Sequence, residues 1–376
     1  MIKTGIYIHI PFCVVKCMYC DFYSITEKED LIPRFIKAIT NEIKNCNINI
    51  SEWIFDTLFI GGGTPSLIKS SYIETILECL DKKFNLSKLK EITIEINPGE
   101  APKNRLYNYK SIGVNRISIG VQSFQPTLLK FLTRIHSKKQ IINTYNDVRE
   151  VGFENVNCDL IYSIPNQTWE MWEDDLRILI DLNPEHISAY TLTVEKGTDL
   201  FTMVEKKTIE MPKNSQESRW FINTRNILSR NGYRPYEVSN FSKMGYQCQH
   251  NYHYWDIEPY LGFGPSAHSF DGKFRWNNAR SLEKYLRCIE TNKTPISKKE
   301  KLSLVDLTNE FIGFGMRMTK GIDLNNIPDS LQKKYNENIL KIINQYPNYF
   351  IKSKDNISFN DNGMLHADFI IPNMII

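Results

Sequence analysis

The chain has 376 residues, of which 41% are hydrophobic, and this share supports a folded core and excludes global disorder. Its 46 basic and 43 acidic residues leave a net charge of +3, which is too balanced to indicate a nucleic-acid binder. No apolar run approaches the ~20 residues that span a bilayer, and no targeting leader opens the chain. We therefore expect a cytoplasmic protein with no transmembrane segment and no nucleic-acid partner.

Short apolar runs alternate with helical patterns through the first two-thirds of the chain. Strands are predicted over residues 5–10, 56–60, 91–96, 116–121, 155–161 and 186–192. Helices are predicted over residues 30–45, 70–82, 103–112, 138–151, 169–182 and 216–231. Repeated βα units indicate parallel strands joined by right-handed crossovers. Because six units fall short of the eight of a closed barrel, the expected α/β fold is a partial, open (β/α)6 barrel.

The pattern changes after residue 232. Residues 233–241 are predicted to form another strand, and residues 293–301, rich in Lys, are predicted to be a linker. Beyond residue 304, two helical patterns and a strand pair predict a small α+β domain, for which a winged helix is one candidate form. The expected domains are residues 1–240 (barrel), 241–300 (a histidine- and aromatic-rich extension with the linker) and 301–376 (the small C-terminal domain).

Three cysteines, Cys13, Cys17 and Cys20, follow the first predicted strand with the spacing C-x3-C-x2-C. A cubane [4Fe–4S] cluster usually takes four thiolates, so three leave one iron with an open, chemically useful position. The alternative is a structural zinc site, which would need His9 or Asp21 as its fourth ligand. The other five of the 8 cysteines are scattered, and we expect small buried side chains rather than disulfides.

Polar residues gather at the carboxyl ends of the predicted strands, where the active sites of barrels form. The run Gly61 to Thr64 could hold an anion through its backbone N–H groups, although it matches neither a Walker loop nor a dinucleotide loop. Carboxylate and guanidinium groups that suit an amino-acid-bearing nucleoside stand near the same rim, together with an amide: Glu95, Gln122, Arg134 and Asp159. Each alone could simply pair within the rim, but the set favours ligand binding.

A histidine- and aromatic-rich segment follows residue 247 and contains His250 and His253 beside Tyr254 and Trp255. Histidine is the usual protein ligand of heme iron. A buried aromatic layer with hydrogen-bonded histidines explains the same residues without a ligand, and from these residues alone it is the better interpretation.

Several segments together resemble radical S-adenosylmethionine proteins: residues 7–22, 61–66, 120–124 and 159–168. The resemblance covers nearly the whole chain and points to the group that contains oxygen-independent coproporphyrinogen III oxidase and a family of heme chaperones. It implies a [4Fe–4S] cluster on Cys13, Cys17 and Cys20, and heme contact at His250. It also implies that S-adenosylmethionine is bound by residues around one rim: Tyr7, Tyr19, Gly62, Gly63, Thr64, Glu95, Gln122, Arg134 and Asp159.

One departure separates the two members of this group. The oxidase usually carries a further cysteine two residues after the third, where this chain has Phe22, and a longer amino-terminal extension. Both differences favour a heme chaperone that transfers heme to acceptor hemoproteins, with an electron donor such as a flavodoxin or ferredoxin. The alternative is the oxidase, an enzyme that decarboxylates coproporphyrinogen III by radical chemistry, and a zinc-stabilised scaffold is a remote third.

Overall fold

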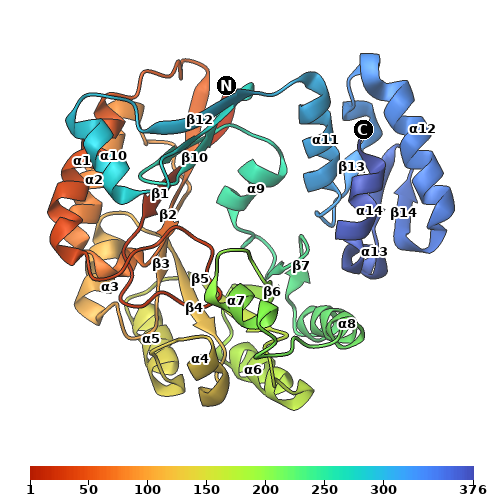
Figure 1. Ribbon diagram of the computed structural model, residues 1–376, viewed down its shortest axis with the longest axis horizontal. Coiled ribbons are helices and arrows are strands. Elements are labelled where there is room, and N and C mark those ends of the chain that lie inside the picture. Colours follow the sequence, from red (N-terminus) through yellow and green to blue (C-terminus); the bar gives the residue numbers. More distant parts are fainter.

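Six parallel strands stand side by side in chain order at the centre of the computed structural model, which describes residues 1–376 (Figure 1). They are β1 (Ile2–Ile10), β2 (Trp53–Gly62), β3 (Glu91–Ile96), β4 (Arg116–Gln122), β5 (Asn155–Tyr162) and β6 (His186–Thr191). The helices that follow them are α1 (Ile32–Lys44), α2 (Ser70–Phe84), α3 (Lys103–Ser111), α5 (Lys138–Glu150), α6 (Trp169–Leu182) and α8 (Asn214–Arg230). The predicted alternation of strands and helices is confirmed.

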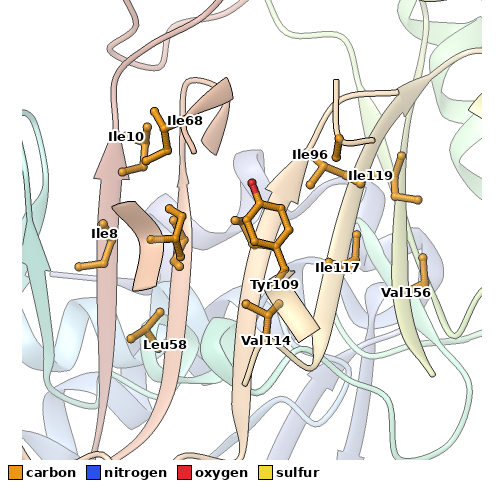
Figure 2. Close-up of a cluster of buried hydrophobic side chains, with 14 of the residues drawn as sticks. Ile8, Ile10, Leu58, Ile68, Ile96, Tyr109, Val114, Ile117, Ile119 and Val156 are labelled. Carbon is orange, nitrogen blue, oxygen red and sulfur yellow. The ribbon is translucent and has the colours of Figure 1, made fainter. Parts of the chain in front are cut away.

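Strand β1 illustrates how the sequence separates the two faces of the sheet. Ile6, Ile8 and Ile10 alternate with Tyr7 and His9, and successive side chains of a strand point to opposite faces. The isoleucines are fully buried in an apolar core of 56 residues, which includes the inward sides of the covering helices. Part of this core is drawn in Figure 2. Each such side chain contributes ~1.5–3 kcal/mol to folding when it leaves water.

The opposite face of the same strands is polar. Buried or half-buried side chains that can form hydrogen bonds or carry charge occupy its alternate positions: Tyr7, His9, Glu91, Glu95, Arg116, Ser118, Gln122, Asn157, Asp159, His186 and Ser188. Burying a polar group is costly unless it is paired. A concave face so rich in polar groups therefore indicates that this side of the sheet serves binding rather than packing.

Further strands extend the sheet at both edges to twelve. Beyond β6 lie β8 (Asn240–Ser242) and β7 (Arg234–Pro235), both antiparallel. Beyond β1 lies β9 (Tyr260–Phe263), which is parallel to it. The antiparallel strands β10 (His268–Phe270), β11 (Phe274–Asn278) and β12 (Ile296–Lys301) complete that edge. The sheet is thus mostly parallel at its centre and antiparallel at its margins.

Two predictions about this part of the chain are wrong. The predicted linker over residues 293–301 contains β12, whose lysines are exposed because it is the edge of the sheet. The ammonium group of Lys299 lies over the rings of Phe274 and Trp276, so an apparently featureless charged run packs as a strand. Lysines on an edge strand also discourage pairing with other chains. The single strand predicted over residues 233–241 is two short strands, β7 and β8.

Short helices went unpredicted: α4 (Pro126–Phe131), α7 (Asp199–Glu205), α9 (Gln249–Trp255) and α10 (Leu282–Glu290). Helix α9 lies between the parallel strands and the C-terminal elements in Figure 1, and it contacts β1 and β2. The carboxylate of Glu91 accepts hydrogen bonds from the backbone N–H groups of Gln249 at 3.0 Å and His250 at 3.1 Å. This side chain therefore fixes the start of α9 against the sheet.

The last fifth of the chain forms the expected small α+β unit. It comprises α11 (Leu304–Gly315), α12 (Asp329–Gln345), α13 (Asp361–Leu365) and α14 (Ala367–Met374), with a three-stranded sheet in the order β13 (Ile322–Asp323), β15 (Asn356–Phe359), β14 (Phe350–Ser353). The unit has its own core of 16 buried residues, which includes Phe221 from α8. Among all the helices, none combines the length and apolar character that crossing a membrane demands.

Candidate functional site

The three clustered cysteines lie in the loop that leaves β1. The loop is tied back at both ends, because Cys13 N donates to Ile25 O at 2.9 Å and Ile25 N donates to Pro11 O at 2.8 Å. Within it, Cys20 N donates to Cys17 O at 3.1 Å. All three cysteines are free and half-buried. The loop thus presents three thiols from a short, pinned segment at the carboxyl end of β1.

A chain of hydrogen bonds joins two of these thiols across the carboxyl ends of three strands. Thr64 Oγ1, after β2, donates to Cys13 Sγ at 3.5 Å and accepts from Asn97 Nδ2 at 3.1 Å. Asn97 Oδ1, after β3, accepts from Arg134 Nη2 at 2.6 Å. Arg134 Nη1 donates to Cys17 Sγ at 3.4 Å. Thr64 and Arg134 therefore lie where the sequence places them, beside the cysteine loop.

Close neighbours require glycine in the run at the end of β2. Gly62 has a φ of +111°, and a Cβ there would lie 2.7 Å from the His9 ring. A Cβ at Gly63 would lie 2.7 Å from Phe12 O and 3.0 Å from Cys13 Sγ. Gly63 N and Thr64 N already donate to carbonyl groups of the β1 end. The run consequently serves first to bring β2 against the cysteine loop, and it leaves little backbone free at residue 63 to bind an anion.

Two carboxyl groups lie on the polar side of the sheet, on strands β3 and β5 with β4 between them. Glu95 accepts from Gly62 N at 3.2 Å, and Asp159 accepts from Asn157 Nδ2 at 2.8 Å and from Ser118 Oγ at 3.3 Å. Burial, and then the charge of Asp159, raise the pKa of Glu95 to about 8. Burial also raises the pKa of Asp159. A cationic or hydroxyl-bearing ligand would relieve this repulsion, which suits an ammonium group or a ribose.

The remaining predicted contacts lie around the same rim. Tyr7 is half-buried on β1. Burial raises the pKa of its hydroxyl, and the charge of Glu95 adds to this effect. Gln122, the last residue of β4, is buried with a φ of +68°. Such a backbone conformation is uncommon outside glycine. Tyr19 lies in the cysteine loop. Burial is the main cause of the raised pKa of its hydroxyl, with a smaller lowering effect from the charge of Arg134 and a smaller raising effect from that of Cys17.

The donor set fits an iron–sulfur cluster. Burial raises the pKa of the Cys13 thiol and raises that of Cys20 to about 11. At neutral pH neither would ionise without a nearby positive charge, and bound iron supplies one. The guanidinium of Arg134 and the hydroxyl of Thr64 already point hydrogen-bond donors at two of the sulfurs, and such hydrogen bonds stabilise the thiolates of a bound cluster.

The zinc alternative loses both of its proposed fourth ligands. His9 Nε2 donates to Tyr23 O at 2.7 Å, and its Nδ1 accepts from the Tyr7 hydroxyl at 3.1 Å. Burial lowers the pKa of His9 to about 4, so it is a neutral histidine with both nitrogens engaged. Asp21 is paired with Arg280 at 2.8 Å. No three His, Cys, Asp or Glu side chains lie close enough together to enclose a single metal ion.

His250 does not lie on this rim. It is 1% exposed on α9, with Nδ1 2.8 Å from Thr57 Oγ1 and Nε2 2.9 Å from the Tyr254 hydroxyl. A Cβ on Gly5 would lie 3.0 Å from its ring, so strand β1 also covers it. His250 is therefore a buried histidine with both ring nitrogens hydrogen-bonded, as the aromatic-layer interpretation expects. Heme contact at this residue stays a prediction.

Sequence reasoning missed several polar residues of the site. Asn97 bridges Thr64 and Arg134, yet in the sequence it reads only as the start of an Asn-Pro-Gly turn. Ser118 and Asn157 hold the Asp159 carboxylate. The alternation of strand residues could have identified both of them. Ser118 lies an even number of positions from Gln122, and Asn157 from Asp159, so each shares the face of its neighbour.

Comparison with known proteins agrees with this geometry. Residues 7–179 match the model of the radical SAM superfamily. The heme chaperone HemW of Lactococcus lactis is 32% identical over 361 residues, which cover 95% of this chain and 93% of that protein. The heme chaperone HemW of Escherichia coli is 38% identical over 280 residues, covering 74% of this chain and 72% of that one.

Among solved structures, the coproporphyrinogen III oxidase HemN of Escherichia coli superposes with a TM-score of 0.84, over 100% of this chain and 90% of HemN. The two sequences are 21% identical, so this likeness concerns the fold. Fold, cysteine loop and family model together define a radical SAM protein, a class that uses S-adenosylmethionine and a [4Fe–4S] cluster. Within that class, the chain belongs to the HemW family.

Proposed function

We propose that this protein is a heme chaperone, which binds heme and passes it to acceptor hemoproteins in the cytoplasm while carrying a [4Fe–4S] cluster and S-adenosylmethionine. One observation carries the proposal. The similarity to the Lactococcus lactis heme chaperone spans 95% of the chain, and therefore includes α9 and the C-terminal unit as well as the cysteine loop. A relative that shared only the radical SAM part would say nothing about heme.

The cluster site in this proposal is the loop after β1. Cys13, Cys17 and Cys20 would hold three irons, and the fourth would stay open to S-adenosylmethionine. When bound, this pair of cofactors supplies one-electron redox chemistry. The half-buried position of all three cysteines leaves the loop accessible to an electron donor such as a flavodoxin or ferredoxin.

The rim residues have separate tasks. Arg134 keeps a positive charge beside Cys17 and would pair with a carboxylate. Glu95 and Asp159, held by hydrogen bonds from Gly62 N and Asn157, would accept hydrogen bonds from an ammonium group or ribose hydroxyls. A bound cation would lower the raised pKa of Glu95 and keep this carboxylate ionised. The remaining contacts proposed for S-adenosylmethionine are Tyr7, Tyr19, Gly62, Gly63, Thr64 and Gln122.

Oxidative decarboxylation of coproporphyrinogen III is the competing function, since HemN has the same fold. Phe22 argues against it. This side chain is 68% exposed at the position where the resemblance gives the oxidase a further cysteine. A large exposed hydrophobic side chain beside the cluster loop suits contact with a partner better than ligation of iron.

The test uses protein reconstituted anaerobically with iron and sulfide. A cubane cluster predicts about four irons per chain. Heme titration is expected to shift the Soret band, and incubation with an apo-hemoprotein is expected to move the heme to that acceptor. Stoichiometric heme binding without transfer, or no heme binding, would contradict the chaperone function. Conversion of coproporphyrinogen III to protoporphyrinogen IX by the same preparation would establish the oxidase instead.

A further inference from the structure

A cleft of about 840 Å³ separates the barrel from the C-terminal unit. Its walls come from the end of β6, from α8 and β8, from α9, and from the C-terminal helices α11, α13 and α14. Figure 1 shows α9 and α8 on one side and α11, α13 and α14 on the other. This volume lies in the usual range for small-molecule sites, ~300–1,000 Å³, and such sites prefer junctions between domains.

The cleft has broad apolar walls. The larger apolar and aromatic side chains that line it come from both sides: Phe221, Tyr254, Trp255, Phe314, Met364 and Leu365. Trp255 and Phe314 meet edge to face, with ring centroids 6.0 Å apart, so α9 and α11 touch along one margin. The aromatic side chains offer flat surfaces to a large planar ligand, and polar residues, among them Glu217, Glu237 and Asn251, line the rest of the cleft.

One histidine of the cleft has free ring nitrogens. The chain has seven histidines, and five of them use at least one ring nitrogen in a hydrogen bond or ion pair. His268 and His366 do not, and only His366 lines the cleft. It lies between α13 and α14, is exposed, and rests against Tyr349 with ring centroids 5.2 Å apart. An exposed imidazole whose nitrogens have no hydrogen-bond partner is an available ligand for iron.

A guanidinium group lies on the same lining. Arg317, just after α11, pairs with Asp368 of α14, and both residues line the cleft. The Asp368 side chain is 91% exposed, and an ion pair so open to water is worth little. A ligand carboxylate could therefore replace Asp368 at small cost and gain a fork-shaped donor.

The cleft also reaches the barrel rim. Tyr190, at the end of β6, lines it and is 40% exposed. Its register partner on β5 is Ile161, two residues beyond Asp159. A ligand in the cleft would therefore lie beside the strand ends that carry the proposed S-adenosylmethionine contacts.

We propose that this cleft binds heme, with His366 as a ligand to the iron and Arg317 paired with a propionate. This assignment rests on the proposed chaperone function and specifies its site. It moves iron ligation from His250, which is buried with both nitrogens bonded, to a histidine of the C-terminal unit. The C-terminal unit thereby contributes one wall of the heme site.

The test is a titration of the full-length, cluster-loaded protein with ferric heme, followed by absorption and electron paramagnetic resonance. His366→Ala is expected to weaken heme binding at least about tenfold and to abolish the signature of histidine-ligated iron. His268→Ala is the matched control, since it removes an exposed, unpaired histidine outside the cleft, and it should behave as wild type. His366→Cys should restore tight binding with a thiolate spectrum.

The outcomes separate the site from the function. If the wild-type protein binds heme and His366→Ala binds it equally well with the same spectrum, the site is overturned and the chaperone function stands. If His268→Ala loses binding as strongly as His366→Ala, the assignment is likewise overturned. If wild type itself binds no heme, the proposed function fails along with the site. Unchanged thermal melting of both alanine variants would exclude misfolding as the cause of a loss.

Discussion

Arg134 donates a hydrogen bond to the thiol of Cys17 at 3.4 Å, although 117 residues separate them. The guanidinium also donates to Gly120 O at 2.8 Å, which fixes it to the end of β4. The guanidinium is therefore held in place with a hydrogen-bond donor directed at the sulfur. The cysteine loop therefore depends on the carboxyl ends of neighbouring strands as well as on its own three cysteines.

Asn97 is the residue on which this dependence can be tested. It donates to Thr64 Oγ1 and accepts from Arg134 Nη2, so Asn97→Ala leaves both partners short of a hydrogen bond. Each lost bond is worth ~1 kcal/mol. We expect affinity for S-adenosylmethionine to fall about tenfold, measured by isothermal titration of the reconstituted protein, with about four irons retained.

Asn115→Ala is the matched control. The Asn115 side chain also makes two hydrogen bonds, but with backbone groups at the amino-terminal end of the same strands. Its Oδ1 accepts from Ile92 N at 2.8 Å, and its Nδ2 donates to Lys90 O at 2.7 Å. This variant should lose a similar amount of stability and keep wild-type affinity for S-adenosylmethionine. Equal losses of affinity in both variants would show that Asn97 acts only through general stability.

Gly63→Ala tests the close approach of β2 to the cysteine loop. A Cβ at this position would lie 2.7 Å from Phe12 O and 3.0 Å from Cys13 Sγ, so backbone must move. We expect the variant to take up less than half of the wild-type iron on reconstitution, measured by iron analysis and absorption. Gly313→Ala, whose Cβ would meet nothing nearer than 3.9 Å on helix α11, should load iron normally and gain up to ~1 kcal/mol in stability.

The six central strands and the rim could be predicted because local sequence determines both. A strand buried against helices on one face alternates apolar and polar residues, as Ile8 and His9 do on β1, and every such strand ends at the same edge of a parallel sheet. The alternation alone therefore predicts that Glu95 and Asp159 share one face of the sheet, as their positions on β3 and β5 show. The three closely spaced cysteines directly follow β1, so their loop is also predicted at the same edge.

Long-range contacts decided what the sequence could not reveal. His250 looks like a ligand in a polar, aromatic segment, but Thr57 and Tyr254 occupy its nitrogens, and Thr57 is 193 residues away. β12 has no apolar pattern, because its partner β11 supplies the ring of Trp276 on which Lys299 packs. Asn97 acquires its role only when β4 brings Arg134 beside it. In each case the information lies in a partner distant in the chain.

His253 should make stability depend on pH. Burial opposes its charge, but ion pairs with Asp56 at 2.9 Å and Glu258 at 2.7 Å outweigh burial and raise its pKa to about 9. Because the folded state holds this proton more tightly, the stabilisation is full below the unfolded pKa of about 6.5 and is lost as pH rises through about 9. The effect is on the order of 3 kcal/mol.

The measurement compares urea unfolding of wild type and His253→Gln between pH 6 and pH 10. Wild type should lose on the order of 3 kcal/mol relative to the variant across this range. Glu95, whose raised pKa of about 8 also favours the protonated folded state, contributes the same slope to both proteins and cancels in the difference. Parallel stability curves would mean that His253 is neutral in the folded state.

Substitutions of Arg317 and Asp368 should change heme affinity in opposite directions. Asp368 occupies the guanidinium that a propionate would need, so Asp368→Asn should tighten heme binding a few-fold, whereas Arg317→Gln should weaken it about tenfold. Arg177→Gln on α6, which removes another surface arginine paired with an aspartate, should leave heme affinity unchanged. Heme titrations of the three variants decide the matter. If Asp368→Asn weakens binding as Arg317→Gln does, the ion pair merely closes the cleft and Arg317 does not bind heme.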